Sequence, residues 1–381
     1  MIKLTNRSHL PAAVGSAPQV DMPFLNYVPN WQRMEELAKK FSFINRIILV
    51  ANGGSINTFR GIYYAFKNKH TTPEVIFVDT NEPTFLNNIL LSSDPSKTLL
   101  LSISKSGENI SQLEATLYFY EFPHKIFITG KKGALYDIAR RDSTIQLITH
   151  ADIGGRFAGL TEVGLMPALL CGFDAHALTS SQSEAIDKAY ALASYVHHME
   201  QNKFTQILVS TYAHYLDGFG LFEQQLFHET FGKNGKGVTV VPVSSPESQH
   251  HTNQRLFGGQ KNLAVVFVKF KPSPMYLSVS SDLFPVNFRE RTLKDFEGLD
   301  LASAFEAEYL GTQSRAEELG IPNVTLELDE LSPKSVGEYI RVWQVASVYG
   351  AVLRGVNPYD QPDVEASKIS SYRERFRPRK D

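Results

Sequence analysis

The feature that most constrains the fold of this chain is an alternation of short apolar runs with segments of helical spacing. Four early runs have the length and composition of buried strands: RIILVA (46–51), EVIFVD (74–79), TLLLSIS (98–104) and KIFITG (125–130). The segment ISQLEATLYFYEF (110–122), which lies between two of them, carries apolar residues at helical spacing. Strands that alternate with helices predict a parallel sheet in an α/β fold, with helices on the faces of the sheet.

The same pattern restarts in the second half of the chain. A helix is expected over 183–201, and a long helix over 331–355 has a start signal at Ser332-Pro333 and a stop signal at Gly355. Three further strands are expected between them: QILVSTY (206–212), VTVVPV (238–243) and LAVVFVKF (263–270). We therefore predict two three-layer α/β/α domains with mainly parallel sheets, formed by residues 26–178 and 179–355.

Three segments do not fit this alternation. Residues 1–25 are rich in proline and weakly patterned, so we expect an extended N-terminal arm. Residues 271–300 are expected to form an excursion of loops and short strands. Residues 356–381 form a polar C-terminal segment whose basic end is typical of a solvated tail.

The composition limits the classes of partner. The chain has 38 basic and 40 acidic side chains in 381 residues, which gives no electrostatic reason to expect a nucleic acid or a membrane surface. No stretch reaches the roughly 18–20 apolar residues of a membrane span, and no signal peptide is recognisable. Cys171, the only cysteine, lies in an apolar run and is expected to be a buried thiol. These features predict a cytoplasmic protein.

Two small-residue turns follow predicted strands and are candidates for phosphate binding. Gly53-Gly54-Ser55 follows the first run, and Ser104-Lys105-Ser106-Gly107 follows the third. In α/β sheets ligands bind at the carboxyl ends of the strands, and a helix start offers free N–H groups to an anion. Each turn alone is more typical of an ordinary helix start, but two on one sheet favour phosphate. Neither has the spacing of a nucleotide-binding loop, which indicates a small phosphorylated metabolite.

A third turn places an arginine directly after two glycines, in DIGGRFAGLTEVGLMP (152–167). One interpretation is a tight turn whose Arg156 covers the end of the apolar helix that follows. The other is that a small anionic ligand must come close to both the backbone and the guanidinium.

A possible general base lies in the second half of the chain. Gln225 and Glu229 are four residues apart and share a helix face, and Gly232 suggests that the helix ends just after Glu229. A carboxylate at the negative end of the helix dipole is favoured in its neutral form, which suits a base. Taken alone, an ordinary surface glutamate is the simpler interpretation, and Lys233 or Lys236 could pair with it.

The remaining candidates are two histidines and a lysine. His250 and His251 are adjacent, so at most one of them is expected to face a given site. No histidine, cysteine or carboxylate pattern has the spacing of metal ligands, so no metal is expected. Lys368 lies in the second turn of a helix expected after NPYDQ (357–361), where a surface lysine is the simpler interpretation.

In this order, these segments resemble the glucose-6-phosphate isomerase family. The family carries a glycine-glycine-serine turn, an SKT or SKSG phosphate loop, GGRFS, ESNGK, a QH loop and a C-terminal DQ-GVE--K. The counterparts here are Gly53-Gly54-Ser55, Ser104-Lys105-Ser106-Gly107, DIGGRFAGLTEVGLMP, ETFGKNGKG, QHHTNQ and DQPDVEASK. The match extends across residues 48–368, and DIGGRF and DQPDVE are its most specific parts. The resemblance implies a pair of sugar-isomerase (SIS) domains, with residues 356–381 closing the active site.

The resemblance also implies residue roles. The family interconverts glucose 6-phosphate and fructose 6-phosphate through a cis-enediolate, in glycolysis and gluconeogenesis. His250 and Lys368 match the pair that opens the sugar ring, Glu229 the base that moves a proton between C1 and C2, and Arg156 the group that stabilises the enediolate. The implied substrate and phosphate ligands are Gly54, Ser55, Ser104, Lys105, Ser106, Asn109, Gly155, Gln225 and Gln361. No cofactor and no metal are implied. A homodimer is implied, with His250 reaching the site of the partner subunit.

Three motifs depart from the family pattern, and the first is the glycine-rich turn, which begins ANGGSIN where the family has GIGGS. The phosphate loop continues with Glu108 and Asn109 where the family usually has threonines, and an acid beside a phosphate repels it unless it points away. Phe231 replaces a polar residue in ETFGK. The alternatives are a non-catalytic sugar-phosphate-binding regulator and an isomerase that also accepts mannose 6-phosphate. An amino-sugar enzyme is disfavoured, because Cys171 is internal and no N-terminal catalytic cysteine is present.

Overall fold

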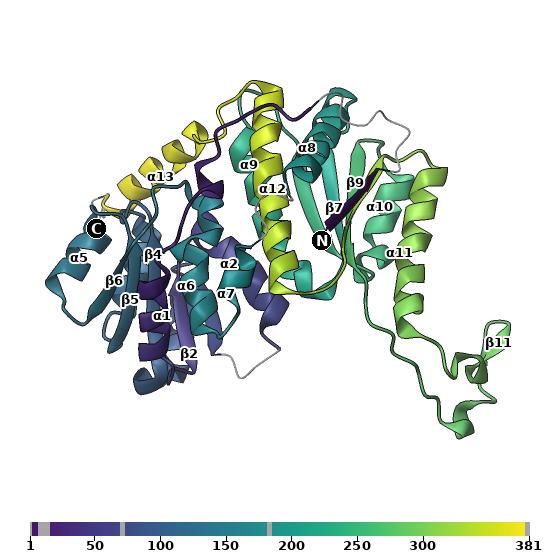
Figure 1. The fold of residues 1–381 in the computed structure, drawn as a ribbon, viewed down its shortest axis with the longest axis horizontal. Coiled ribbons are helices and arrows are strands. Elements are labelled where there is room, and N and C mark those ends of the chain that lie inside the picture. The colour runs from purple at the N-terminus through teal and green to yellow at the C-terminus, as the bar shows by residue number, and fades with distance from the viewer. Residues whose placement is uncertain (1, 7–15, 69–72, 181–184, 378–381) are drawn as a thin grey trace.

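Two mainly parallel sheets, each with helices on both faces, stand side by side in the computed structural model, which describes residues 2–6, 16–68, 73–180 and 185–377 (Figure 1). The first sheet has the order β3-β2-β4-β5-β6, and all of its neighbouring strands are parallel. Its strands are β2 (Arg46–Val50), β3 (Glu74–Val78), β4 (Thr98–Ser104), β5 (His124–Thr129) and β6 (Ile145–Thr149). This sheet and its helices confirm the α/β class expected for the first part of the chain.

The two faces of the first sheet are buried by different sets of helices. Alternate strand residues such as Leu99 and Leu101 belong to a core shared with one set, whereas Leu100 and Phe127 belong to the core of the other set. The first set is α1 (Trp31–Lys40), α2 (Gly54–Phe66) and α6 (Glu162–Leu170). The second set is α3 (Pro83–Ser92), α4 (Ile110–Tyr118) and α5 (Ala134–Arg141). The three-layer arrangement expected from the alternating pattern is therefore confirmed.

The second sheet repeats this plan, with the order β1-β12-β9-β7-β8. Its strands are β1 (Ile2–Asn6), β7 (Gln206–Tyr212), β8 (Thr239–Ser244), β9 (Leu263–Phe270) and β12 (Asn323–Leu328). Three helices cover one face: α8 (Ile186–Gln201), α9 (Gly220–Phe231) and α12 (Pro333–Arg354). Two cover the other: α10 (Thr252–Gly258) and α11 (Leu301–Glu318). Because one apolar cluster includes residues of α2, α9 and α12, the two sheets share a continuous core.

The beginning of the chain differs from the expected arm. Residues 2–6 form β1, which pairs antiparallel with β12 at the edge of the second sheet, with Ile2 opposite Leu328. The amide of Ile2 also donates to both carboxylate oxygens of the buried Glu338, at 3.1 Å each. Five residues carry too little periodicity to be recognised as a strand, and the partner strand lies at the far end of the sequence. Parts of the expected arm, residues 7–15, lie outside the described residues.

The signals for α12 are confirmed at both ends. The helix begins at Pro333 after Ser332, whose hydroxyl accepts a hydrogen bond from the amide of Ser335 at 3.3 Å, and it ends before Gly355. Gly355 has φ +65°, a conformation that glycine adopts without strain. The expected excursion at 271–300 is a projection with the hairpin β10 (Asn287–Phe288) and β11 (Arg291–Thr292) (Figure 1).

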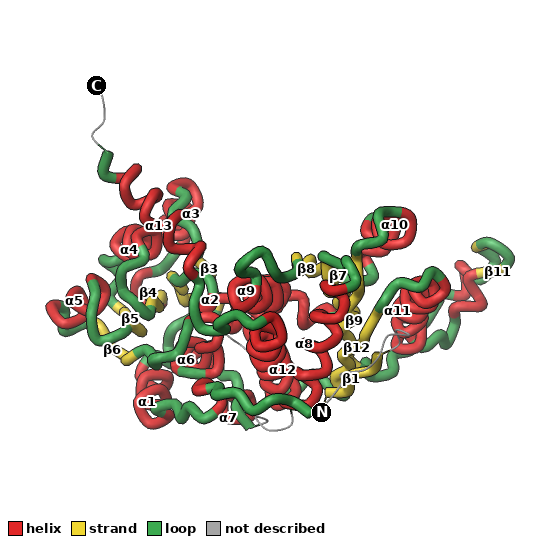
Figure 2. Tube along the Cα trace, turned by 90° about the horizontal axis from the view of Figure 1, so that it is seen from above, coloured by secondary structure: helices red, strands yellow, loops and turns green. Residues whose placement is uncertain are grey.

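The C-terminal segment returns to the first domain. Helix α13 (Pro362–Arg375) lies beside α4 of that domain (Figure 2). The guanidinium of Arg375 pairs with Glu114 of α4 at 2.7 Å. The loop between α12 and α13 therefore crosses from the second domain to the first. Among the described helices, none has the length and apolar composition needed to cross a membrane.

Candidate active site

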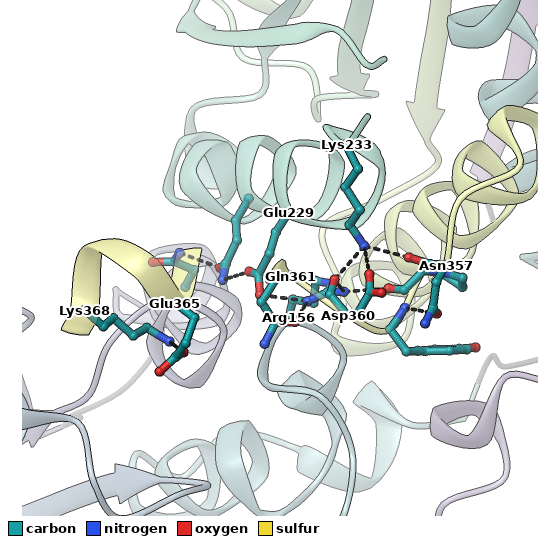
Figure 3. A network of polar contacts seen from close by, with 12 residues as sticks. Arg156, Glu229, Lys233, Asn357, Asp360, Gln361, Glu365 and Lys368 are labelled. Atoms are coloured by element: carbon teal, nitrogen blue, oxygen red, sulfur yellow. Dashed lines mark hydrogen bonds and ion pairs between the residues drawn. The ribbon is translucent and has the colours of Figure 1, made fainter. Parts of the chain in front are cut away.

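Arg156 lies at the junction of the two domains and is almost fully buried. It is the second residue of a short 3₁₀ helix (Gly155–Leu160), and its side chain is 2% exposed. Its Nη1 donates to Glu229 Oε1 at 2.7 Å and to Gln361 Oε1 at 3.0 Å, and its Nη2 donates to the carbonyls of Pro358 and Asp360. Burial lowers the pKa of Arg156, and the charge of Glu229 acts in the opposite direction. The guanidinium thus joins α9, the 3₁₀ helix and the C-terminal loop (Figure 3).

Gly54 explains how the turn before Arg156 fits against α2. A Cβ added to Gly54 would lie 2.2 Å from the amide nitrogen of Arg156 and 2.4 Å from the carbonyl oxygen of Gly155. No larger residue could therefore begin α2 without displacing this backbone. Ser55 lies at the same helix start, and its Oγ would be 3.9 Å from a Cβ added to Gly155. The two glycine-rich turns noted in the sequence are consequently in direct contact.

Glu229 lies in the last turn of α9 and faces Arg156. Its second oxygen, Oε2, accepts a hydrogen bond from Gln225 Nε2 at 2.8 Å, and its side chain remains 22% exposed. A carboxylate held by one guanidinium and one amide is fixed in orientation yet reachable from the solvent. Neither of the lysines considered as its partner contacts it: Lys233 bonds to the C-terminal loop, and Lys236 donates to the carbonyl of Arg354.

Lys233 anchors the C-terminal loop between α12 and α13. This contact was not predicted from the sequence. Its Nζ lies 2.6 Å from the carbonyl of Asn357 and 2.7 Å from Asp360 Oδ1, and it also bonds to the carbonyl of Asp360 (Figure 3). The hydrogen bond from Lys233 lowers the pKa of Asp360. Gln361 follows directly, so this anchor holds it against Arg156. These partners lie far apart in sequence, and no local spacing signals such a contact.

The two candidate phosphate turns lie at the carboxyl ends of adjacent strands of the first sheet. Gly53-Gly54-Ser55 follows β2, and Ser104 ends β4, which pairs with β2 in parallel and is followed by Lys105 and Ser106. Ser104 Oγ accepts a hydrogen bond from the amide of Gly107 at 3.2 Å. Lys105 pairs with the fully exposed Asp152 at 2.8 Å, which places an exposed cation at this edge of the sheet.

The two residues that depart from the family's phosphate loop have separate local roles. Glu108 turns toward α5, where its Oε1 accepts a hydrogen bond from the amide of Ala134 at 3.0 Å. Its charge therefore stabilises the start of that helix. Asn109 begins α4 as its N-cap, and its Oδ1 accepts from the amide of Gln112 at 3.3 Å. Phe231, which departs from the family's ESNGK motif, is buried against Phe227 at a centroid distance of 4.9 Å.

His250 and Lys368 are not brought to Arg156 and Glu229 within the described part of this single chain. His250 is exposed at the end of a 3₁₀ helix (Glu247–His250) and lines a separate cavity of about 450 Å³ with Asn253 and Arg315. Lys368 lies on α13 with its side chain 52% exposed, and its contact is with Glu365 at 3.4 Å (Figure 3). Within the described ranges, no group of three or more His, Cys, Asp or Glu side chains is placed to hold a metal ion.

Comparisons with known proteins place the chain among sugar-phosphate isomerases. No family model matches it. A probable glucose-6-phosphate isomerase of Methanococcus maripaludis is 27% identical over 360 residues, covering 89% of this chain and 80% of that protein. A glucose-6-phosphate isomerase of Alkaliphilus metalliredigens is 28% identical and covers 93% and 85%. The chain is a homologue of the glucose-6-phosphate isomerases.

Solved structures support the same fold for this glucose-6-phosphate isomerase homologue. A hypothetical protein of Thermus thermophilus superposes with a TM-score of 0.80 at 24% identity, covering 91% of this chain and 87% of that one. The glucose-6-phosphate isomerase of Chlamydia trachomatis superposes with a TM-score of 0.74 at 18% identity, covering 90% and 72%. The expected sugar-isomerase fold is confirmed by these likenesses.

Proposed function

We propose that this glucose-6-phosphate isomerase homologue interconverts glucose 6-phosphate and fructose 6-phosphate in the cytoplasm. The observation that carries the proposal is the 2.7 Å pair between Glu229 and the buried Arg156, where the two domains and the C-terminal loop meet. Proton transfer at a carbon next to a carbonyl requires a base, which a carboxylate provides. It also requires a positive group to stabilise the charge on the oxygen, which a guanidinium provides. The names of the curated relatives agree with this chemistry.

In the proposed reaction, Glu229 removes the proton from C2 of the open-chain aldose and returns it to C1. Charge develops on the carbonyl oxygen as the cis-enediolate forms, and a fixed positive group lowers the barrier most when it is pre-oriented and shielded from water. Arg156 suits this role because it is held by four hydrogen bonds and its guanidinium does not give up a proton at neutral pH. Glu229 carries the carbon-bound proton from C2 to C1, and the hydroxyl proton moves from O2 to O1 in the enediolate, so the step balances without a co-substrate.

The phosphate of the substrate is assigned to the edge of the first sheet. The proposed ligands there are Gly54, Ser55, Ser104, Lys105, Ser106 and Asn109. The start of α2 offers amide donors and a partial positive charge, and Lys105 adds a cation at the neighbouring turn. Gly155, Gln225 and Gln361 are proposed to line the sugar. Gly54 lies against the backbone of Arg156, and the side chain of Arg156 contacts Glu229. A sugar whose phosphate is bound at the start of α2 would therefore extend toward Glu229.

Ring opening is assigned to His250 and Lys368, and it calls for a second subunit. His250 lies away from Glu229 in this chain, so we propose a homodimer in which each His250 serves the site of the partner. Lys368 would act from α13, whose first turn is tied to Arg156 through Gln361. The C-terminal segment would thereby close the site over the sugar.

A coupled assay tests the proposed reaction directly. Purified protein is supplied with fructose 6-phosphate, and the formation of glucose 6-phosphate is followed without added cofactor. Rapid turnover is the expected result, and mannose 6-phosphate run in parallel decides the substrate range. Sugar-phosphate binding without turnover would contradict the proposal and support a regulator.

A further inference from the structure

The start of α2 meets α9 through a pair of side-chain amides. Asn57 Nδ2 donates to Gln225 Oε1 at 2.9 Å, and Gln225 Nε2 donates in turn to Glu229 Oε2 at 2.8 Å. Gln225 also lies against Gly53, where an added Cβ would be 3.0 Å from its Nε2. Its amide is therefore enclosed between the first turn of α2 and the proposed base.

The direction of these hydrogen bonds is set by residues that lie further from the site. A side-chain amide has an acceptor oxygen on one side and a donor nitrogen on the other. A hydrogen-bond donor beside the oxygen therefore fixes the direction in which the nitrogen points. Arg60 Nη1 lies 3.4 Å from Asn57 Oδ1, and a guanidinium can only donate. Arg60 is itself held by Asp79 at 2.6 Å. Asn57 must consequently turn its NH₂ group toward Gln225.

We propose that Asn57 is a positioning residue that orients the amide of Gln225 so that it donates to Glu229. This inference rests on the proposed function, in which Glu229 is the base. With the opposite orientation, Gln225 would face the carboxylate with its oxygen, and two acceptors would be in contact. Asn57 is 9% exposed, and its described side-chain hydrogen bonds are to Arg60 and Gln225, so the effect of its amide on the reaction passes through Gln225.

A double-mutant cycle tests whether Asn57 acts through Gln225. Asn57→Ala is expected to lower kcat/KM about tenfold in the otherwise unchanged protein, as for the loss of one buried hydrogen bond. In the Gln225→Ala background the same change should have less than about a twofold effect, because coupled residues are not additive. Equal factors in both backgrounds would overturn the proposal.

A second comparison of variants tests whether Asn57 acts as a hydrogen-bond donor or only through the packing of its side chain. Asn57→Asp keeps the shape of the side chain but replaces its donor with an acceptor. Asn57→Asp should therefore impair kcat at least as much as Asn57→Ala, whereas a residue that only fills space would tolerate the aspartate better. Asn87→Asp, which adds the same charge on the exposed face of α3, is the matched control. An Asn57→Asp variant with nearly unchanged kcat contradicts the inference.

One readout does not depend on turnover, so it separates this inference from the proposed reaction. The side-chain amide protons of Gln225, assigned by NMR from their loss in Gln225→Met, report what Gln225 donates to. Their resonances should move in Glu229→Gln and in Asn57→Ala and stay in place in Asn87→Asp. Resonances that respond to Glu229→Gln but not to Asn57→Ala would overturn the role of Asn57, even in a protein without isomerase activity.

Discussion

At the scale of single residues, Glu229 is the group whose replacement tests the chemistry most directly. Glu229→Gln keeps the size of the side chain and can still accept from Arg156 Nη1, but it removes the base. We expect kcat to fall by at least about 10²–10⁴-fold, while fructose 6-phosphate still binds. Glu36→Gln on the exposed face of α1 is the control. Steady-state kinetics and calorimetric binding give both quantities, and near-normal turnover of Glu229→Gln would remove Glu229 from the mechanism.

The neighbouring cation makes a second prediction at this scale. Arg156→Lys keeps the charge but loses the planar fork that reaches Glu229, Gln361 and the carbonyl of Pro358 together. We expect kcat to fall about 10²–10³-fold, as for the loss of an oriented donor in other enzymes. Arg33→Lys, at a half-buried position of α1 away from the site, is the matched change. A rise in KM alone, with kcat preserved, would mean that Arg156 only binds the substrate.

At the scale of elements, the C-terminal loop depends on one lysine of the second domain. Lys233→Met removes three hydrogen bonds from residues 357–360 and leaves Asp360 without its cation. We expect the loop and the first turn of α13 to exchange amide hydrogen faster and KM to rise, because Gln361 loses its support. Lys39→Met on α1 should leave both unchanged. Unaltered exchange at 357–361 would show that Arg156 holds the loop unaided.

A second prediction concerns the packing of α9 against α12. Glu223 is fully buried there, accepts a hydrogen bond from Tyr339 and has no described partner for its Oε2. Burial raises the pKa of Glu223 to about 7. Because this folded value lies above the unfolded one, the contribution of Glu223 to stability is full below pH 4.5 and is lost as the pH rises through 7.

The variant Glu223→Gln cannot ionise and so removes this dependence. Between pH 4.5 and 8 its free energy of unfolding should improve relative to that of the unchanged protein by up to about 3 kcal/mol. Urea denaturation at several pH values measures the difference. A constant difference across this range would show that Glu223 does not titrate on unfolding.

Much of the element order follows from local sequence, whereas the site follows only in part. Apolar runs identified the strands that become β2, β3, β4, β5, β7, β8 and β9, because buried parallel strands are continuously apolar. The strands β1, β6 and β12 were not predicted, since short or polar-interrupted strands lack that signature.

The site could be predicted from the sequence only in part. Because residues four apart share a helix face, the spacing of Gln225 and Glu229 predicted that their side chains lie together. The contacts of Lys233 with residues 357–360 and of Asn57 with Gln225 depend on how the domains pack, which local periodicity does not encode.

At the scale of the whole molecule, the proposed exchange of His250 between subunits predicts complementation. Homodimers of His250→Ala and of Glu229→Gln should each be nearly inactive. In a heterodimer formed by co-expression, one of the two sites regains both residues. Random pairing should therefore restore about one quarter of the unchanged activity, since half of the dimers are mixed and each has one complete site. No recovery beyond the two separate variants would show that His250 does not act across an interface.

The pairing of β1 with β12 has a consequence for the order in which the molecule forms. Residues 2–6 leave the ribosome before residues 16–377, yet their partner strand, which ends at Leu328, is translated more than 300 residues later. Until β12 is made, residues 2–6 have no partner strand and the edge of the second sheet at β9 stays unpaired. A bulky group attached next to Ile2 would therefore hinder this late pairing.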